Sequence, residues 1–230
     1  MIGFYNYTTF LTYLSLISAG FGIVSSLSGT GHPYVGMFFL LFCGLCDAFD
    51  GKVARTKKDR SETECKFGIQ IDSLSDVVAF GVLPVCIAVG LLKGDILSAF
   101  KVSGSLGRIL LTLSVIIMSC YLLAGMIRLA YFNVMEEERQ KSEDGARKYY
   151  TGLPITSAAV TFPFVLAVNF ILKKLADVDL TFLYFLFMSL SAAAFVAKVQ
   201  LRKPGLKFIL VLVGIGAVEA IATLLVYCLA

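Results

Sequence analysis

The sequence predicts an all-α integral membrane protein, a bundle of about seven transmembrane helices, with six or eight as the alternatives. The chain of 230 residues is 58% hydrophobic and has a mean hydropathy of +0.84, which is too apolar for a soluble domain of this length. We expect residues 1–230 to form one membrane domain. A spanning helix needs about 20 mainly apolar residues, and seven stretches meet this requirement: 9–28, 34–54, 69–92, 107–131, 153–172, 180–199 and 207–229.

The first segment follows a polar stretch, and the next two carry acidic residues among their apolar ones. One of two interpretations of this stretch is that Asn6, Thr8 and Thr9 cap the first helix, because their side chains can accept hydrogen bonds from its first N–H groups; the other is that the stretch lies near a bound substrate. Gly81 and Pro84 lie in the third segment. Both residues weaken or bend a helix, and a bend there would shape a cavity.

The last four segments carry few ionisable residues. Arg128 lies near the end of the fourth, and residues 134–149 mix both signs of charge, which is typical of a solvated loop or a surface helix. In the seventh segment, Glu219 is an isolated acid for which the sequence identifies no partner. Small residues close to it would allow a neighbouring helix to approach, and a homodimer is therefore one expectation.

Positive charge is concentrated on one side of the expected bundle. Most of the 20 Lys and Arg residues follow the second, fourth and sixth segments, and the positive-inside rule places that side in the cytoplasm. We therefore expect a multi-pass protein of the cell membrane with its N-terminus inside and, with seven spans, its C-terminus outside. The net charge of +4 would attract anionic lipid headgroups and a nucleotide substrate, and nothing in the chain requires nucleic acid as a partner.

Two acid pairs, Asp47 with Asp50 and Asp72 with Asp76, lie in the second and third segments. Residues three or four apart share one face of a helix, so each pair points to one side. Buried carboxylates of like charge repel each other and are destabilising unless a cation lies between them. Oxygen ligands without His or Cys suit a hard divalent ion. The sequence thus predicts a Mg²⁺ or Mn²⁺ site near the cytoplasmic face.

The acids belong to a longer pattern, Asp47-x2-Asp50-Gly51-x2-Ala54-Arg55 followed by Gly68-x3-Asp72-x3-Asp76. This pattern resembles the signature of the CDP-alcohol phosphatidyltransferases. The resemblance implies a helical membrane enzyme that transfers a phosphatidyl group from a CDP-linked lipid to an alcohol and releases CMP. It also implies that Asp76 acts as the base and that Gly51, Ala54 and Arg55 bind the nucleotide. Residues 56–67 form a longer connection than is usual in the family.

Three further stretches read IDSLSDVVAFGV at 71–82, RLAYFN at 128–133 and YTGLP at 150–154. Together they resemble one group within this family, the CDP-diacylglycerol–serine O-phosphatidyltransferases. The resemblance implies CDP-diacylglycerol and L-serine as substrates, with Arg128 and Asn133 facing the acceptor, where a guanidinium can pair with the serine carboxylate. Members of the group commonly have Arg where this chain has Tyr131, so one expected cation is absent.

The sequence leaves three alternatives open. Another acceptor, such as glycerol 3-phosphate or inositol phosphate, would use the same chemistry but would favour more cations than the chain offers around Tyr131. A cation transporter would use the four Asp as a permeation site, although it would not require Gly51, Ala54 and Arg55. For Arg128 taken alone, a cation that reaches from a helix end towards the membrane surface is the simpler interpretation.

Overall fold

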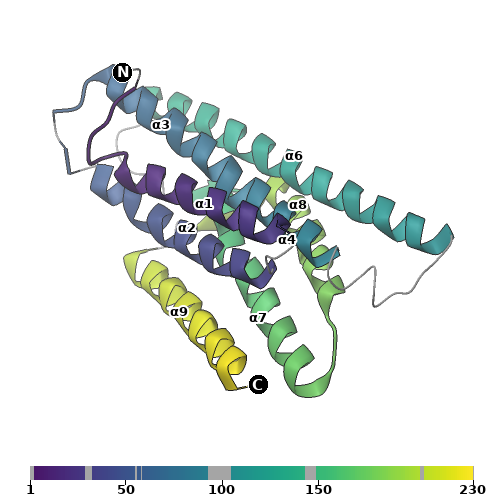
Figure 1. The fold of residues 1–230 in the computed structure, drawn as a ribbon. Helices are drawn as coiled ribbons and strands as arrows, with labels where there is room; N and C mark the ends of the chain where they lie inside the picture. The colour runs from purple at the N-terminus through teal and green to yellow at the C-terminus, as the bar shows by residue number, and fades with distance from the viewer. Residues whose placement is uncertain are drawn as a thin grey trace.

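The fold is a bundle of helices with one pair of very short strands (Figure 1). A computed structural model of the chain describes residues 3–28, 33–54, 56–57, 59–92, 105–142, 149–202 and 205–229. The elements are α1 (Phe10–Leu27), α2 (Pro33–Ala54), α3 (Glu62–Asp76), the π-helix η1 (Val77–Val82), α4 (Leu83–Leu91), α6 (Ser105–Ser142), β1 (Tyr149–Thr151), the 3-10 helix η3 (Ile155–Ser157), α7 (Ala158–Ala176), α8 (Thr181–Val196), β2 (Gln200–Arg202) and α9 (Leu206–Leu229).

Seven of the described helices are apolar, and each of the seven predicted segments falls on one of them. Five are long and apolar enough to cross a membrane, and the two shorter ones are Thr181–Val196 and Ile209–Leu225. The predicted fold class is confirmed, and the chain is a multi-pass membrane protein. The five long helices are Phe10–Leu27, Pro33–Ala54, Glu62–Leu91, Ser105–Arg139 and Ile155–Ala176.

Two helices extend further than hydropathy predicts, because polar contacts set their ends. Helix α3 begins at Glu62 rather than 69, since Ser61 accepts a hydrogen bond from the backbone N–H of Glu64 at 3.1 Å. The second half of the expected connection 56–67 is therefore helical. Helix α6 continues to Ser142, where an ion pair of 2.7 Å between Glu136 and Arg139 supports its last turns.

Small residues let the first helices pack closely. Helix α1 contacts α2 and α4, and its buried residues include Ser18, Gly22 and Ser26. A side chain at Gly36 of α2 would place its Cβ 2.2 Å from the Ser26 hydroxyl oxygen and 2.8 Å from Ile87. The α1, α2 and α4 backbones therefore approach each other as small-residue interfaces in membranes do. On the opposite side of the bundle from α6, α9 packs against α7 and α2 (Figure 1).

A π-helical turn follows directly after Asp76, in the stretch where the sequence predicted a weakened helix. Pro84 has no N–H to donate to the carbonyl of Phe80, four residues before it. Two tyrosine hydroxyls bond the carbonyls of this region instead. Tyr121 donates to the Phe80 oxygen at 2.6 Å and Tyr184 donates to the Pro84 oxygen at 2.9 Å. These bonds fix the helix that carries Asp76 against α6 and α8.

We expect Tyr121→Phe to lower the midpoint of thermal unfolding in detergent. The substitution leaves the buried Phe80 carbonyl without this donor, a loss of about 1–3 kcal/mol. Tyr131→Phe on the same helix is the matched control, because the Tyr131 side chain is 51% exposed and its loss should change little. Equal midpoints for the two variants would contradict this role of Tyr121.

Candidate functional site

Two helices bring the acid pairs together. Asp47 and Asp50 lie in the last two turns of α2, and Asp72 lies in the second half of α3, all three half-buried. One carboxylate oxygen from each lies within 4.8 Å of the other two. Asp76, one turn after Asp72, stands outside this trio. The structure thus gathers three of the four predicted ligands directly and holds the fourth beside them.

The trio fits a divalent cation by its donor chemistry. All its ligand atoms are carboxylate oxygens, which favour Mg²⁺ or Mn²⁺ over softer metals. Three carboxylates this close together repel one another when they are charged. A bound cation would relieve this repulsion. Proximity of the three acids therefore supports a metal site without identifying the ion.

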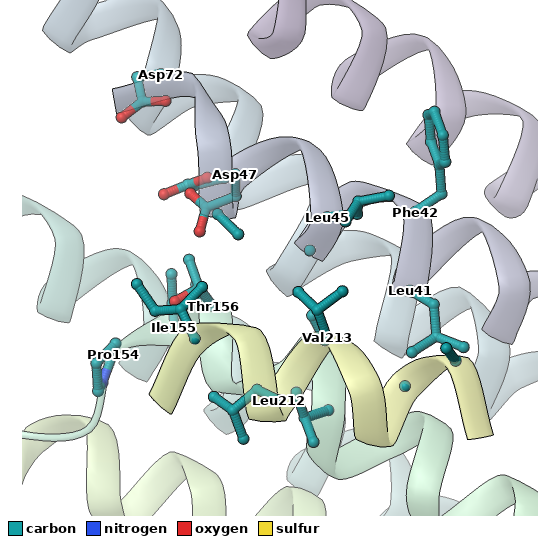
Figure 2. A pocket seen from close by; sticks show the side chains of 18 of the residues that line it. Leu41, Phe42, Leu45, Asp47, Asp72, Pro154, Ile155, Thr156, Leu212 and Val213 are labelled. Carbon is teal, nitrogen blue, oxygen red and sulfur yellow. The ribbon is translucent and has the colours of Figure 1, made fainter. Parts of the chain in front are cut away.

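A cavity of about 620 Å³ opens beside the acids (Figure 2). Asp47, Asp72 and Asp76 line it together with one cation, Arg128. Most of its remaining wall is apolar and comes from α2, α7 and α9. Asp50 is not among the residues that line this cavity. The apolar lining of the cavity includes Phe38, Leu41, Leu45, Ile155, Val160, Ile209, Leu212 and Val213.

Arg128 is held on the cavity wall rather than extended towards the membrane surface. Its side chain belongs to α6 and is only 6% exposed. The Nε donates a hydrogen bond to the carbonyl of Leu153 at 2.9 Å, and the guanidinium lies 4.8 Å from the centre of the Phe132 ring. Arg128 and Asp76 attract each other electrostatically. The cavity thus has a fixed cation beside its acids.

The neighbours of Arg128 take different directions. Asn133 does not line the cavity, and its side-chain amide donates to the hydroxyl of Ser73 at 2.7 Å, which joins α6 to α3. Tyr131 also lies outside the cavity lining and is largely exposed. The structure therefore brings Arg128 to the acids but places Asn133 against Ser73. The Arg that the group commonly has at position 131 would therefore lie at an exposed site outside the cavity lining.

The proposed nucleotide residues lie at the end of α2. Gly51 and Ala54 are partly buried there, whereas Arg55 lies outside the described residues. The carbonyl of Ala54 accepts a hydrogen bond from Nη1 of Arg60 at 3.5 Å. Sequence reasoning missed Arg60, because it belongs to no motif position. The only signal was the unusual length of residues 56–67.

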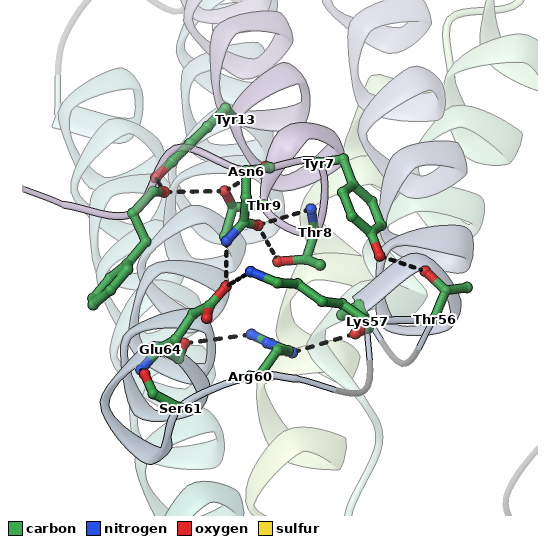
Figure 3. Close-up of polar contacts among 12 residues, drawn as sticks. Asn6, Tyr7, Thr8, Thr9, Tyr13, Thr56, Lys57, Arg60, Ser61 and Glu64 are labelled. Atoms are coloured by element: carbon green, nitrogen blue, oxygen red, sulfur yellow. Dashed lines mark hydrogen bonds and ion pairs between the residues drawn. The ribbon is translucent and has the colours of Figure 1, made fainter.

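A polar network ties the segment before α1 to the start of α3 (Figure 3). The Asn6 amide nitrogen donates to Oε1 of Glu64, and Nζ of Lys57 lies 2.7 Å from the same oxygen. The prediction that Asn6, Thr8 and Thr9 cap the first helix is wrong. Thr9 is the N-cap residue but makes no side-chain capping bond. The Asn6 nitrogen binds Glu64, and its Oδ1 accepts from the backbone N–H of Thr8 at 3.0 Å, before the helix begins.

The side-chain carboxylate of Glu219 in α9 has no hydrogen-bond partner among the described residues. Both its carboxylate oxygens are buried, and the residue is 7% exposed. Gly216, three residues earlier, packs inside the chain, because an added Cβ would lie 3.0 Å from Leu41. Gly216 therefore serves a contact within this chain, whereas Gly214 and Ala217 are exposed, and the predicted homodimer stays untested.

Comparison with known proteins identifies relatives of this chain. A model of the CDP-alcohol phosphatidyltransferase family matches residues 5–193. The chain is 33% identical over 171 residues to a CDP-diacylglycerol–serine O-phosphatidyltransferase of Saccharomyces cerevisiae, a match that covers 72% of this chain and 54% of the relative. It is 34% identical over 141 residues to the protein of that name from Helicobacter pylori, covering 60% of this chain and 49% of the relative.

A third relative is an archaetidylserine synthase from Methanothermobacter thermautotrophicus. The two chains are 34% identical over 149 residues, which cover 64% of this chain and 53% of the relative. The chain thus spans about half the length of the curated relatives it matches. Helix α9 lies after the part that the family model matches.

We expect Mn²⁺ or Mg²⁺ to raise the melting temperature of the purified protein by about 5 °C at saturation, because an ion bound only to the folded state stabilises it. Asp50→Asn should lose most of this shift. Asp177→Asn is the matched control, since Asp177 is exposed at the end of α7 with φ of 54°, a conformation that Asn readily adopts. A full shift with Asp50→Asn would contradict the metal site.

Proposed function

Because the chain belongs to the CDP-alcohol phosphatidyltransferase family, we propose that it transfers the phosphatidyl group of CDP-diacylglycerol to the hydroxyl of L-serine. The products are phosphatidylserine and CMP. The observation that carries the proposal is the cavity in which Asp47, Asp72 and Asp76 face Arg128 beside a mainly apolar wall. Such a cavity suits a donor with a charged diphosphate and apolar chains. Relatives whose names specify serine support the choice of acceptor.

In this proposal the acids hold the diphosphate end of the donor. Asp47, Asp50, Asp72 and Asp76 would ligate Mg²⁺ or Mn²⁺, which supplies charge neutralisation at the diphosphate and a better leaving group in CMP. The cytidine part would lie at the end of α2, against Gly51, Ala54 and Arg55. The acyl chains would follow the apolar wall formed by α2, α7 and α9.

Asp76 is the proposed base. Its carboxylate lines the cavity together with Asp72 and Arg128, so it shares one cavity with the groups proposed for the diphosphate and for the acceptor. The serine oxygen forms a bond to the phosphatidyl phosphorus while the bond from that phosphorus to the CMP oxygen breaks. Asp76 takes the hydroxyl proton. Its position matters more than its basicity, because a carboxylate is a weak base unless it is aligned with the proton that it removes.

Arg128 is the proposed binding residue for the serine carboxylate. Contacts with Leu153 and Phe132 hold its guanidinium on the cavity wall, and a fixed guanidinium can bind a carboxylate in a bidentate manner. Asn133 remains a predicted acceptor residue. Its bond to Ser73 also favours an indirect contribution, through the position of α6.

The proposal includes the setting of the reaction. We place the protein in the cell membrane, with residues 1–230 acting as one domain and the acids near the cytoplasmic face, where CMP and serine are soluble. The surrounding lipids supply the donor from within the bilayer. Most of the Lys and Arg residues follow the second, fourth and sixth apolar segments, which supports this orientation.

The deciding experiment is CMP release by the purified protein in detergent with CDP-diacylglycerol, Mn²⁺ or Mg²⁺, and one alcohol at a time. We expect release with L-serine and none with glycerol 3-phosphate or inositol phosphate. Release only with a phosphorylated acceptor would keep the chemistry and overturn the acceptor, and no release at all would favour a cation transporter.

Asp76→Asn is the control for chemistry in this assay. The amide keeps the size of the side chain but cannot accept the proton, so turnover should fall by about 100-fold or more. A melting temperature close to that of the wild type would show that the fold is intact. Retained turnover would remove Asp76 as the base.

We expect Arg128→Lys to raise the KM for serine about tenfold or more with a smaller change in kcat, because an ammonium group cannot form the bidentate pair. The measurement is CMP release against serine concentration at saturating CDP-diacylglycerol. Arg108→Lys is the matched control on the same helix, where Arg108 is exposed. An unchanged KM in Arg128→Lys would exclude direct serine binding by Arg128.

A further inference from the structure

Arg60 connects the ends of the two helices that carry the acids (Figure 3). Its Nη1 donates to the carbonyl of Ala54 at 3.5 Å, and its Nη2 donates to the carbonyl of Glu64 at 3.4 Å. The Ala54 carbonyl is one of the last in α2, which have no partner within their own helix. The Nε of Arg60 is buried and has no hydrogen-bond partner among the described residues, so the two terminal nitrogens hold the guanidinium.

Gly68 gives this guanidinium its space. A Cβ added at Gly68 would lie 2.6 Å from Nη2 of Arg60, and the next neighbour within 4 Å is Cζ of the same side chain at 3.8 Å. Among the described residues, a methyl group added at position 68 would therefore push against the side chain of Arg60. The glycine of the acid pattern and an arginine outside it form one packed unit.

This unit lies one helical turn beyond the acid cluster on both helices. Ala54 comes four residues after Asp50, and Gly68 comes four residues before Asp72. Residues four apart share a helix face and are about 6 Å apart. Oxygens of Asp50 and Asp72 also lie within 4.8 Å of each other. The bridge made by Arg60 thus stands on the same stripe as the acids, at the end where α2 carries Gly51 and Ala54.

A second contact strengthens the same junction. The backbone carbonyl of Glu64 accepts the hydrogen bond from Arg60. On its side chain, Oε1 lies 2.7 Å from Nζ of Lys57 and accepts a hydrogen bond from the Asn6 amide nitrogen. The segment before α1, the connection between the helices and the first turn of α3 therefore meet at one residue. A change at Arg60 would loosen a junction that three segments share.

We propose that Arg60 is a positioning residue, which holds the end of α2 against the start of α3 and thereby fixes the place at the end of α2 where the nucleotide binds, and that Gly68 leaves the space that Arg60 occupies. The inference rests on the proposed function, because it takes the end of α2 as the place where CMP binds. It assigns Gly68 a role through Arg60 rather than through direct contact with the nucleotide.

A double-mutant cycle tests this assignment. CMP affinity in the presence of Mn²⁺ is measured by calorimetry on the purified protein in detergent, together with the melting temperature, for Arg60→Ala, Gly68→Ala and the double variant. We expect each single variant to weaken CMP binding about tenfold. The double variant should bind no more weakly than Arg60→Ala alone, because the added methyl group then meets empty space.

Three further variants make the comparison specific. Arg60→Lys can reach only one of the two carbonyls and should bind CMP with intermediate affinity. Gly20→Ala should change nothing, since no atom lies within 4 Å of an added Cβ at this exposed position. Arg108→Ala removes an exposed arginine and controls for the loss of positive charge.

Three results would overturn the inference. If the fold-losses in CMP affinity of the two single variants multiplied in the double variant, Gly68 would act independently of Arg60. Tighter CMP binding by Arg60→Ala would mean that Arg60 occupies the place of the nucleotide. Coupling in the melting temperature without coupling in CMP affinity would leave Arg60 merely structural. Failure of the proposed function is distinguishable, because CMP would then still bind to the protein, whereas no CMP would be released from CDP-diacylglycerol when L-serine is supplied.

Discussion

The structure depends on holding like charges together inside a membrane-spanning bundle. Asp47, Asp50 and Asp72 approach within 4.8 Å, although burial and mutual repulsion both oppose their charged forms. Two helices can resist this repulsion only if their relative position is fixed by other contacts. At one end, Arg60 connects α2 to α3. At the other, Tyr121 and Tyr184 bind the carbonyls around the π-helical turn after Asp76. The acids thus lie between two anchored ends.

The cavity beside the acids combines two environments that a lipid substrate requires. Its polar part comes from α2, α3 and α6, which supply Asp47, Asp72, Asp76 and Arg128, and its apolar part continues along α2, α7 and α9. Helix α9 lies after residues 5–193, the part that the family model matches, yet it contributes residues from Ile209 to Ala220 to this wall. The region shared with the family therefore carries the charged groups, whereas α9 completes the apolar side.

Hydropathy and helical periodicity predict most of this architecture, because they depend on local sequence. Seven apolar segments each fall on an apolar helix, and the spacing of the Asp residues places each pair on one face. Helix ends were predicted less well, since capping by Ser61 and ion pairing by Arg139 extend α3 and α6 beyond their apolar residues. The contacts of Arg60 with Gly68, and of Asn133 with Ser73, join different elements, and no local pattern encodes them.

The contact between Asn133 and Ser73 explains how the acceptor and donor ends can stay in register. Ser73 follows Asp72 directly, and Asn133 comes five residues after Arg128. A hydrogen bond of 2.7 Å between their side chains limits how far α6 can slide along α3. Because Arg128 and Asp72 project from these same two helices into one cavity, such sliding would change the distance between the cation and the acids. If Arg128 binds the acceptor as proposed, Asn133 can affect acceptor binding without touching the acceptor, since its bond to Ser73 limits changes in the separation of Arg128 and Asp72.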